Sequence, residues 1–142
     1  MEKKRLSRIL EKTEGAILKE LAEPLIEKYP VQVLRKPSKT MVMIRMKETV
    51  AKTEFYLGEL LACEAMVEMN HSRGFALMAG DDLEKVFYGA VLDAACNMEY
   101  PQKEELLRRL QALEKELEEK EQQEIRMHQA TKVQFETLDT NY

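Results

Sequence analysis

The residues of this chain that most often act in catalysis or metal binding are two histidines and two cysteines. His71 lies in a turn-rich segment, where a solvated imidazole is the simplest interpretation. His128 lies on a predicted helix, and we interpret it as a surface residue, a helix-end partner or a donor to a substrate at a subunit interface. A metal site needs about three convergent protein ligands, and the histidines with Cys63 and Cys96 do not show such spacing. We therefore predict no metal site.

The segment from Gly80 to Asp82 invites comparison with an anion site, because it precedes a predicted helix. The free amides and the dipole at a helix start attract phosphate groups. Two carboxylates at this position already satisfy them, and Asp81 with Glu84 matches a capping arrangement. The sequence therefore favours structural capping over phosphate binding.

Two further pairs of residues have simple structural explanations. Glu64 and Glu68 lie one alternation apart on a predicted strand, and we interpret them as a solvated or partner-facing stripe rather than as paired catalytic acids. Cys63 and Cys96 occupy core-facing positions of a predicted strand and a predicted helix. Unpaired cysteines behave as small apolar residues, so we expect two buried free thiols rather than a disulfide.

The familiar motifs of catalysis are missing from the sequence. It contains no GxGxxG, no GxxxxGK followed by Ser or Thr, no HExxH, no CxxC and no GxSxG. We therefore predict no catalytic, cofactor-binding or metal-ligating residue in this chain.

Periodicity predicts the elements that hold these residues. From residue 60 to 69 the odd positions are apolar, which indicates a strand with one buried face. Residues 70–74 form a turn and residues 75–79 a second strand, so a β-hairpin is the simplest interpretation. From Leu83 onward the apolar spacing becomes three and four, as in a helix that packs on this sheet.

The whole chain is predicted to be a single α+β domain, residues 1–142. An antiparallel sheet of about four to five short strands is packed by helices, and Gly58 marks a bulge in it. In the helical start, Thr13 is expected to cap a second helix, and Pro24 to break the helix at Ala22 or Glu23. The predicted segments are an N-terminal helical segment (1–30), the antiparallel sheet (31–80), a packing helix (81–98), a long helix (101–131) and a strand-like tail (132–142).

The long helix carries a short leucine seam that could pair two copies of the chain. Beyond it, residues 118–124 contain no apolar side chain, so we expect the helix there to meet solvent or a polar partner. The tail alternates like a strand and could add to its own sheet or to another chain's sheet. The seam consists of Leu106, Leu110, Leu113 and Leu117.

Composition sets limits on the class of protein. With 44% hydrophobic and 34% charged residues, the chain is typical of a soluble globular protein. A net charge of -4 disfavours nucleic-acid binding, and the basic clusters at residues 3–8 and 35–39 are interpreted as solvated surface. The sequence predicts no membrane span and no secretory signal, so we expect a cytoplasmic protein.

Several segments, taken in order, resemble a known family. They are Leu57 to Leu61, Arg73-Gly74, the strand FALMAGDD, Val91 to Ala95 and Ala130 to Phe135. In this order and spacing the chain resembles the G subunit of the phosphonate carbon-phosphorus lyase system, PhnG.

The resemblance implies an accessory subunit of a large complex that also contains the H, I and J chains. With the L chain, such a complex displaces adenine from ATP by an alkylphosphonate and gives ribose 1-phosphonate 5-triphosphate. ATP and alkylphosphonate are then substrates of the complex, and the catalytic groups and iron-sulfur ligands belong to other chains. The alternative is a stand-alone homo-oligomeric binding or scaffold protein, for example a homodimer paired through the leucine seam.

Overall fold

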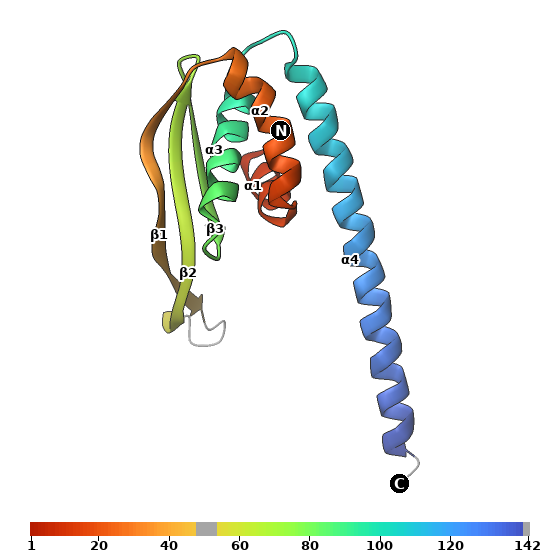
Figure 1. Ribbon diagram of the computed structural model, residues 1–142. Coiled ribbons are helices and arrows are strands. Elements are labelled where there is room, and N and C mark those ends of the chain that lie inside the picture. Colours follow the sequence, from red (N-terminus) through yellow and green to blue (C-terminus); the bar gives the residue numbers. More distant parts are fainter. Residues whose placement is uncertain (48–53, 141–142) are drawn as a thin grey trace.

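The computed structural model describes the backbone of residues 1–47 and 54–140, and the side chains of residues 1–44 and 58–129. A three-stranded sheet lies beside helix α3, helices α1 and α2 lie on the other side of α3, and α4 projects away from the body (Figure 1). The elements are α1 (Lys3–Lys12), α2 (Gly15–Lys28), β1 (Val31–Lys47), β2 (Glu54–Met69), β3 (Ser72–Ala79), α3 (Leu83–Asn97) and α4 (Lys103–Thr140). The α+β class predicted from the sequence is confirmed.

The sheet is antiparallel, with the strand order β1-β2-β3. β2 and β3 form the predicted hairpin, from Met69 paired with Ser72 at the turn to Ala62 paired with Ala79 at the far end. Asn70 (φ 48°) and His71 (φ 63°) adopt left-handed backbone conformations between them. Two-residue turns with this conformation match the twist of the flanking strands, which fixes the register of the hairpin.

In the described residues the sheet has three strands, not the four or five predicted. The two strands predicted before residue 48 are continuous in β1, and the two predicted between residues 54 and 69 are continuous in β2. Pro37 does not end β1. β1 is an edge strand, and a residue whose backbone nitrogen faces away from the neighbouring strand needs no N–H for the hydrogen-bond ladder. The register shifts next to the pair of Ile44 with Gly58, so the predicted bulge is confirmed, but the ladder continues past it.

The start of the chain forms two helices, and both details predicted for them are wrong. Thr13 caps the end of α1 rather than the start of α2, since its N–H (3.0 Å) and its hydroxyl (2.6 Å) both donate to the Ile9 carbonyl. Pro24 lies inside α2 instead of breaking it. The carbonyl of Glu20, which loses its intrahelical donor there, belongs to an exposed residue, and the buried Leu25 holds the next turn against the core.

The predicted strand in the tail is also wrong. α4 continues as a helix to Thr140, well past the predicted end at residue 131. No glycine or proline interrupts the sequence from Lys103 to Thr140, and extending an existing helix requires no new nucleation step. Residues 141–142 lie outside the described residues.

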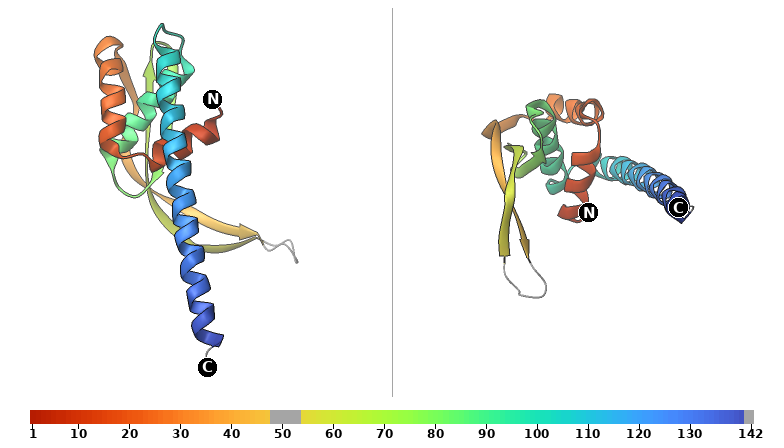
Figure 2. Two further views of the ribbon diagram at one scale, coloured as in Figure 1. Left: turned by 90° about the vertical axis from the view of Figure 1, so that its right-hand side faces the viewer. Right: turned by 90° about the horizontal axis from the view of Figure 1, so that it is seen from below.

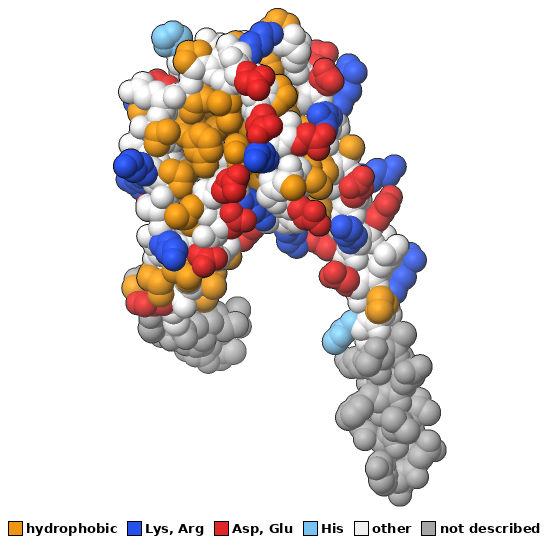
Figure 3. Space-filling view, in the orientation of Figure 1, with side chains coloured by type: hydrophobic (Ala, Val, Ile, Leu, Met, Phe, Trp, Pro, Cys, Tyr) orange, Lys and Arg blue, Asp and Glu red, His pale blue; other side chains and the backbone are white. Residues whose placement is uncertain are grey.

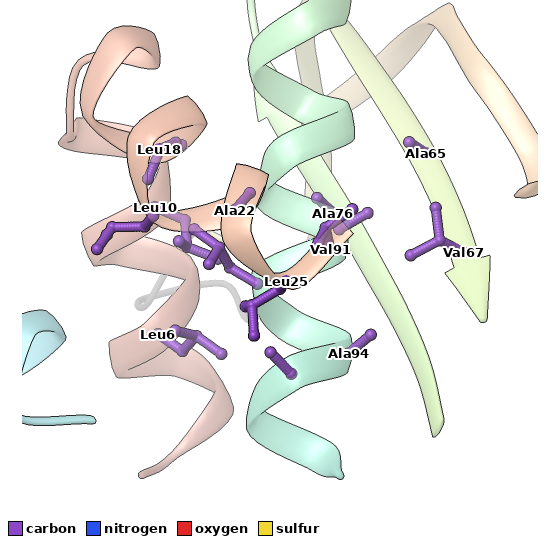
Figure 4. Packing of buried hydrophobic residues seen from close by; sticks show 14 of the residues in the cluster. Leu6, Leu10, Leu18, Ala22, Leu25, Ala65, Val67, Ala76, Val91 and Ala94 are labelled. Carbon is purple, nitrogen blue, oxygen red and sulfur yellow. The ribbon is translucent and has the colours of Figure 1, made fainter. Parts of the chain in front are cut away.

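The core lies between the sheet and the helices, with α3 in the middle (Figure 2). Side chains of α1, α2, α3, β2 and β3 converge there, as the labelled residues of Figure 4 show. α3 approaches the sheet closely because small residues meet at the contact. A Cβ atom on Gly74 of β3 would lie only 2.0 Å from the carbonyl oxygen of Ala90 in α3. The glycine is therefore required by this helix–sheet contact.

Candidate functional site

Both histidines lie on the surface of the protein. His71 is an exposed residue of the β2–β3 turn, as predicted. His128 is exposed too, so its interpretation as a surface residue is confirmed, and the helix-end interpretation is wrong because α4 continues for more than two turns beyond it. It lines a shallow hollow between α4 and α1, together with Arg8, Lys12 and Glu121. Within the described residues, no group of three His, Cys, Asp or Glu side chains is placed to hold a metal ion.

The segment before α3 is a helix cap. Asp82 is the N-cap residue, and its Oδ1 accepts a hydrogen bond of 3.0 Å from the backbone N–H of Lys85. The predicted capping is thus confirmed, but at Asp82 rather than Asp81. Gly80 adopts φ 100°, a conformation that favours glycine, and its N–H donates to the carbonyl of Leu61 at 2.9 Å. This geometry explains Gly80 and Asp82 without a phosphate ligand.

Both cysteines are free thiols, as predicted, but only Cys63 is buried and Cys96 is partly exposed. Burial raises the pKa of Cys63, and the neighbouring Asp82 and Asp81 carboxylates raise it further. Burial is also the main reason that the pKa of Cys96 rises to about 11. Because the thiolate is the nucleophilic form, both residues are poor nucleophiles at neutral pH. They contribute to packing.

The paired acids of β2 face basic side chains of neighbouring strands. Glu64 forms an ion pair with Arg35 of β1, with 3.0 Å between Oε1 and Nη1. Glu68 lies opposite Gln32 on one side and Arg73 on the other in the ladder. This arrangement supports the interpretation as a stripe on the outer face of the sheet, rather than as a pair of catalytic carboxyl groups.

A cleft of about 340 Å³ lies between α2 and α4. Its walls include Leu21, Leu25 and Leu106, and the Nζ of Lys28 at its rim donates to the Oε1 of Gln102 at 3.2 Å. Tyr100 also lines the cleft, and burial raises its pKa to about 12, so its hydroxyl stays neutral. The cleft is mainly apolar, and the charged residues that line it are Lys28, Glu105 and Arg109.

The leucine seam of α4 packs on its own chain. Leu110 is fully buried and Leu106 is 7% exposed, while Leu113 and Leu117 are partly buried against the same core. The seam is therefore already occupied. A homodimer through it would first have to separate α4 from the body, so the structure lends this alternative no support.

A row of ion pairs joins α1 to α4 beyond the seam. Arg5 donates two hydrogen bonds to the carboxylate of Glu114, at 2.6 and 3.0 Å. Further along, Arg8 and Lys12 both pair with Glu121. The Nζ of Lys12 lies 2.6 Å from the Oε1 of Glu121. The sequence predicts Arg5 and Arg8 to be solvated surface residues, so these two ion pairs correct that prediction. Matching intervals of seven residues, Arg5 to Lys12 and Glu114 to Glu121, are the signal that could have identified the pairs.

These ion pairs predict a pH-dependent contribution to stability. The hydrogen bond from Arg5 lowers the pKa of Glu114 from 4.5, and Lys12 followed by Arg8 lowers that of Glu121. Each folded-state pKa lies below its unfolded value, so the stabilisation is complete above about pH 4.5 and is lost as the pH falls. We expect Glu121→Gln to lower the thermal midpoint at pH 7, and the difference from wild type to shrink and then vanish as the pH falls through the lowered folded-state pKa of Glu121. A difference that persists at low pH would contradict this account.

A second projecting element is formed by β1 and β2. β3 pairs with β2 only from Ala62 to Met69, so the outer parts of β1 and β2 form a two-stranded ribbon. We call this ribbon, residues 41–47 and 54–61, the β1–β2 arm. Its described side chains include several large apolar residues that are 39–55% exposed: Met41, Met43, Ile44, Leu60 and Leu61. The sequence pattern had predicted a half-buried strand here, but no other element of the described chain covers the arm.

These features define an α+β protein with two projecting elements and, in the part of the chain that is described, no catalytic cluster. A family model described as "Phosphonate metabolism protein PhnG" matches residues 1–139. The chain therefore belongs to the PhnG family and takes part in phosphonate metabolism. A comparison with curated proteins finds no match. None of the helices in the described residues is long and apolar enough to cross a membrane.

Proposed function

We propose that this chain is an accessory subunit of the carbon-phosphorus lyase core complex. With the H, I and L subunits it supports displacement of adenine from ATP by an alkylphosphonate, which gives ribose 1-phosphonate 5-triphosphate. The observation that carries the proposal is the family match over nearly the whole chain, residues 1–139. On its own the chain has no enzymatic activity in this account.

The chemistry of the side chains supports an accessory role. In the described residues the two thiols are protonated at neutral pH, the histidines are exposed, and Asp82 before α3 caps that helix. Displacement at a ribose carbon requires groups that bind phosphates and stabilise developing charge. We assign these groups, and the binding of ATP and alkylphosphonate, to the other subunits. The chain holds no cofactor of its own and acts in the cytoplasm, where ATP is available.

The shape of the molecule supports a role in assembly. α4 continues beyond Glu121, its last described ionic contact with α1, and the β1–β2 arm extends past the end of β3 (Figure 1). Elements that extend from a folded body bury little surface within their own chain, and they offer large areas to neighbours. We propose that these elements hold the I, H and J subunits together and organise the site of the I subunit.

Co-expression tests this proposal directly. The full chain with an affinity tag is made in the same cells as the untagged I subunit, and the eluate is analysed by size-exclusion chromatography with light scattering. We expect a stable complex with defined stoichiometry. If the two chains elute separately at every protein concentration, the assignment as a subunit is wrong.

A further inference from the structure

We propose that the β1–β2 arm is a docking surface for another protein chain, one that presents apolar side chains and carboxylates. The inference rests on the proposed function, because it names the surface through which this chain enters its complex. Three observations support the proposal: the pairing of the strands, the exposed apolar side chains and the distribution of charge.

The pairing of the strands shows that the arm has little support of its own. Among the described residues, β2 pairs only with β1 from the Met41–Leu61 pair to the Lys47–Glu54 pair, because its pairing with β3 ends at Ala62. Two-stranded ribbons without a packed face are marginally stable in water. We therefore expect the arm to be stabilised when another surface covers it.

Both faces of the arm expose apolar side chains. Leu61 lies two residues from the buried Cys63 on β2, so both side chains are on the helix side of the sheet. Leu61 is nevertheless 41% exposed, because α3 does not reach it. Met41, its cross-strand partner, is 55% exposed. On the opposite face, Leu60 is 43% and Ile44 39% exposed. A globular domain that acts as a monomer rarely exposes large apolar side chains on both faces of a pair of strands.

The apolar surface continues from the arm onto the outer face of the sheet. Phe75 and Leu77 of β3 are 41% and 44% exposed, and Leu77 lies opposite Glu64 in the ladder. Hydrophobic side chains gather over β2 and β3 and along the arm in the space-filling view (Figure 3). Exposed apolar groups interspersed with ion pairs such as Arg35 with Glu64 are typical of a protein–protein interface.

Charge indicates which kind of chain covers this surface. The part of β1 next to the arm carries Arg35, Lys36 and Lys39, and no acidic residue occurs anywhere in β1. Lysines on an edge strand oppose direct strand pairing, and two copies of this strand would bring like charges together. A second copy of the chain is therefore disfavoured. A partner that lays apolar groups on the faces of the arm, with carboxylates beside these lysines, satisfies both features.

A charge-pair variant tests the surface without disrupting the arm. Met41→Glu combined with Leu61→Lys places opposite charges directly across the two strands, which supports their pairing, while it makes the docking face polar. The control exchanges an exposed ion pair at the start of α4, before the part that extends beyond Glu121: Glu104→Arg with Arg108→Glu. Both variants keep the net charge, and circular dichroism checks that both are folded.

The readout is the amount of I, H and J subunits that co-purify with the tagged full chain at equal expression. We expect the arm variant to lose about tenfold or more of these subunits, and the control to retain wild-type amounts. We also expect assembly with the wild-type chain to weaken as salt is added, because part of the contact is ionic.

The outcomes separate the two proposals. If wild type assembles and the arm variant assembles equally well, the arm is not the docking surface, whereas the proposed function stands. If wild type itself fails to bind these subunits, the proposed function is wrong, and this inference falls with it. Sedimentation equilibrium of the isolated chain gives a third outcome. A dimer that the arm variant converts to a monomer would identify a second copy as the occupant and overturn the proposal.

Discussion

Replacing Gly74 with alanine is expected to destabilise the fold by about 3 kcal/mol or more. The new Cβ would lie 2.0 Å from the carbonyl oxygen of Ala90 and 2.4 Å from the backbone nitrogen of Ala94. Both are backbone atoms of α3, so the whole helix must move away from the sheet to make room. Domains of this size are stable by about 5–15 kcal/mol, and the change would consume a large part of that.

Gly15→Ala is the matched control for this substitution. Gly15 is the first residue of α2, and an added Cβ would meet its nearest neighbours at 3.6 Å, an ordinary contact distance. We expect a stability equal to wild type or slightly above it, because alanine reduces the freedom of the unfolded chain. Urea denaturation followed by circular dichroism measures all three proteins. A Gly74→Ala midpoint equal to wild type would show that α3 does not pack as closely as described.

The second large effect is expected for Leu110→Ala. Leu110 is fully buried and anchors α4 to the core. Removing a buried leucine side chain leaves a cavity and costs about 2–5 kcal/mol. We expect the urea midpoint to fall and hydrogen exchange in the first half of α4 to accelerate, because the helix loses its main apolar contact with the body.

Ile125→Ala on the same helix provides the comparison. Ile125 is 55% exposed, so its truncation removes little packing within the chain, and alanine favours the helix. We expect little change in the urea midpoint. Equal losses for the two variants would mean that α4 is not held by the buried seam.

The elements closest to the core could be predicted from the sequence. The alternation from residue 60 to 69 and the helical spacing after Leu83 arise because one face of each element is buried, and both appear as predicted. The length of the strands could not be predicted, because Pro37 and Gly58 are normally signs of a break. Whether a strand continues through them depends on its place at the sheet edge and on the partner's register.

The tail shows the limit of periodicity over a few residues. Val133 and Phe135 alternate as in a strand, but two apolar positions cannot outweigh the continuation of a long helix. Similarly, the sequence predicts Arg5 and Arg8 of α1 to be solvated, because ion pairs such as Arg5 with Glu114 depend on which helices become neighbours in space. Asp82, by contrast, caps α3 through a local contact, and the sequence predicted that feature to within one residue.

The most direct test of the proposed function is reconstitution of the first reaction. The H, I and L subunits are incubated with ATP and an alkylphosphonate, with and without this chain, and released adenine is measured by chromatography. We expect adenine release only when the chain is present, and none from the chain alone. Equal release without it would contradict its role as a required subunit.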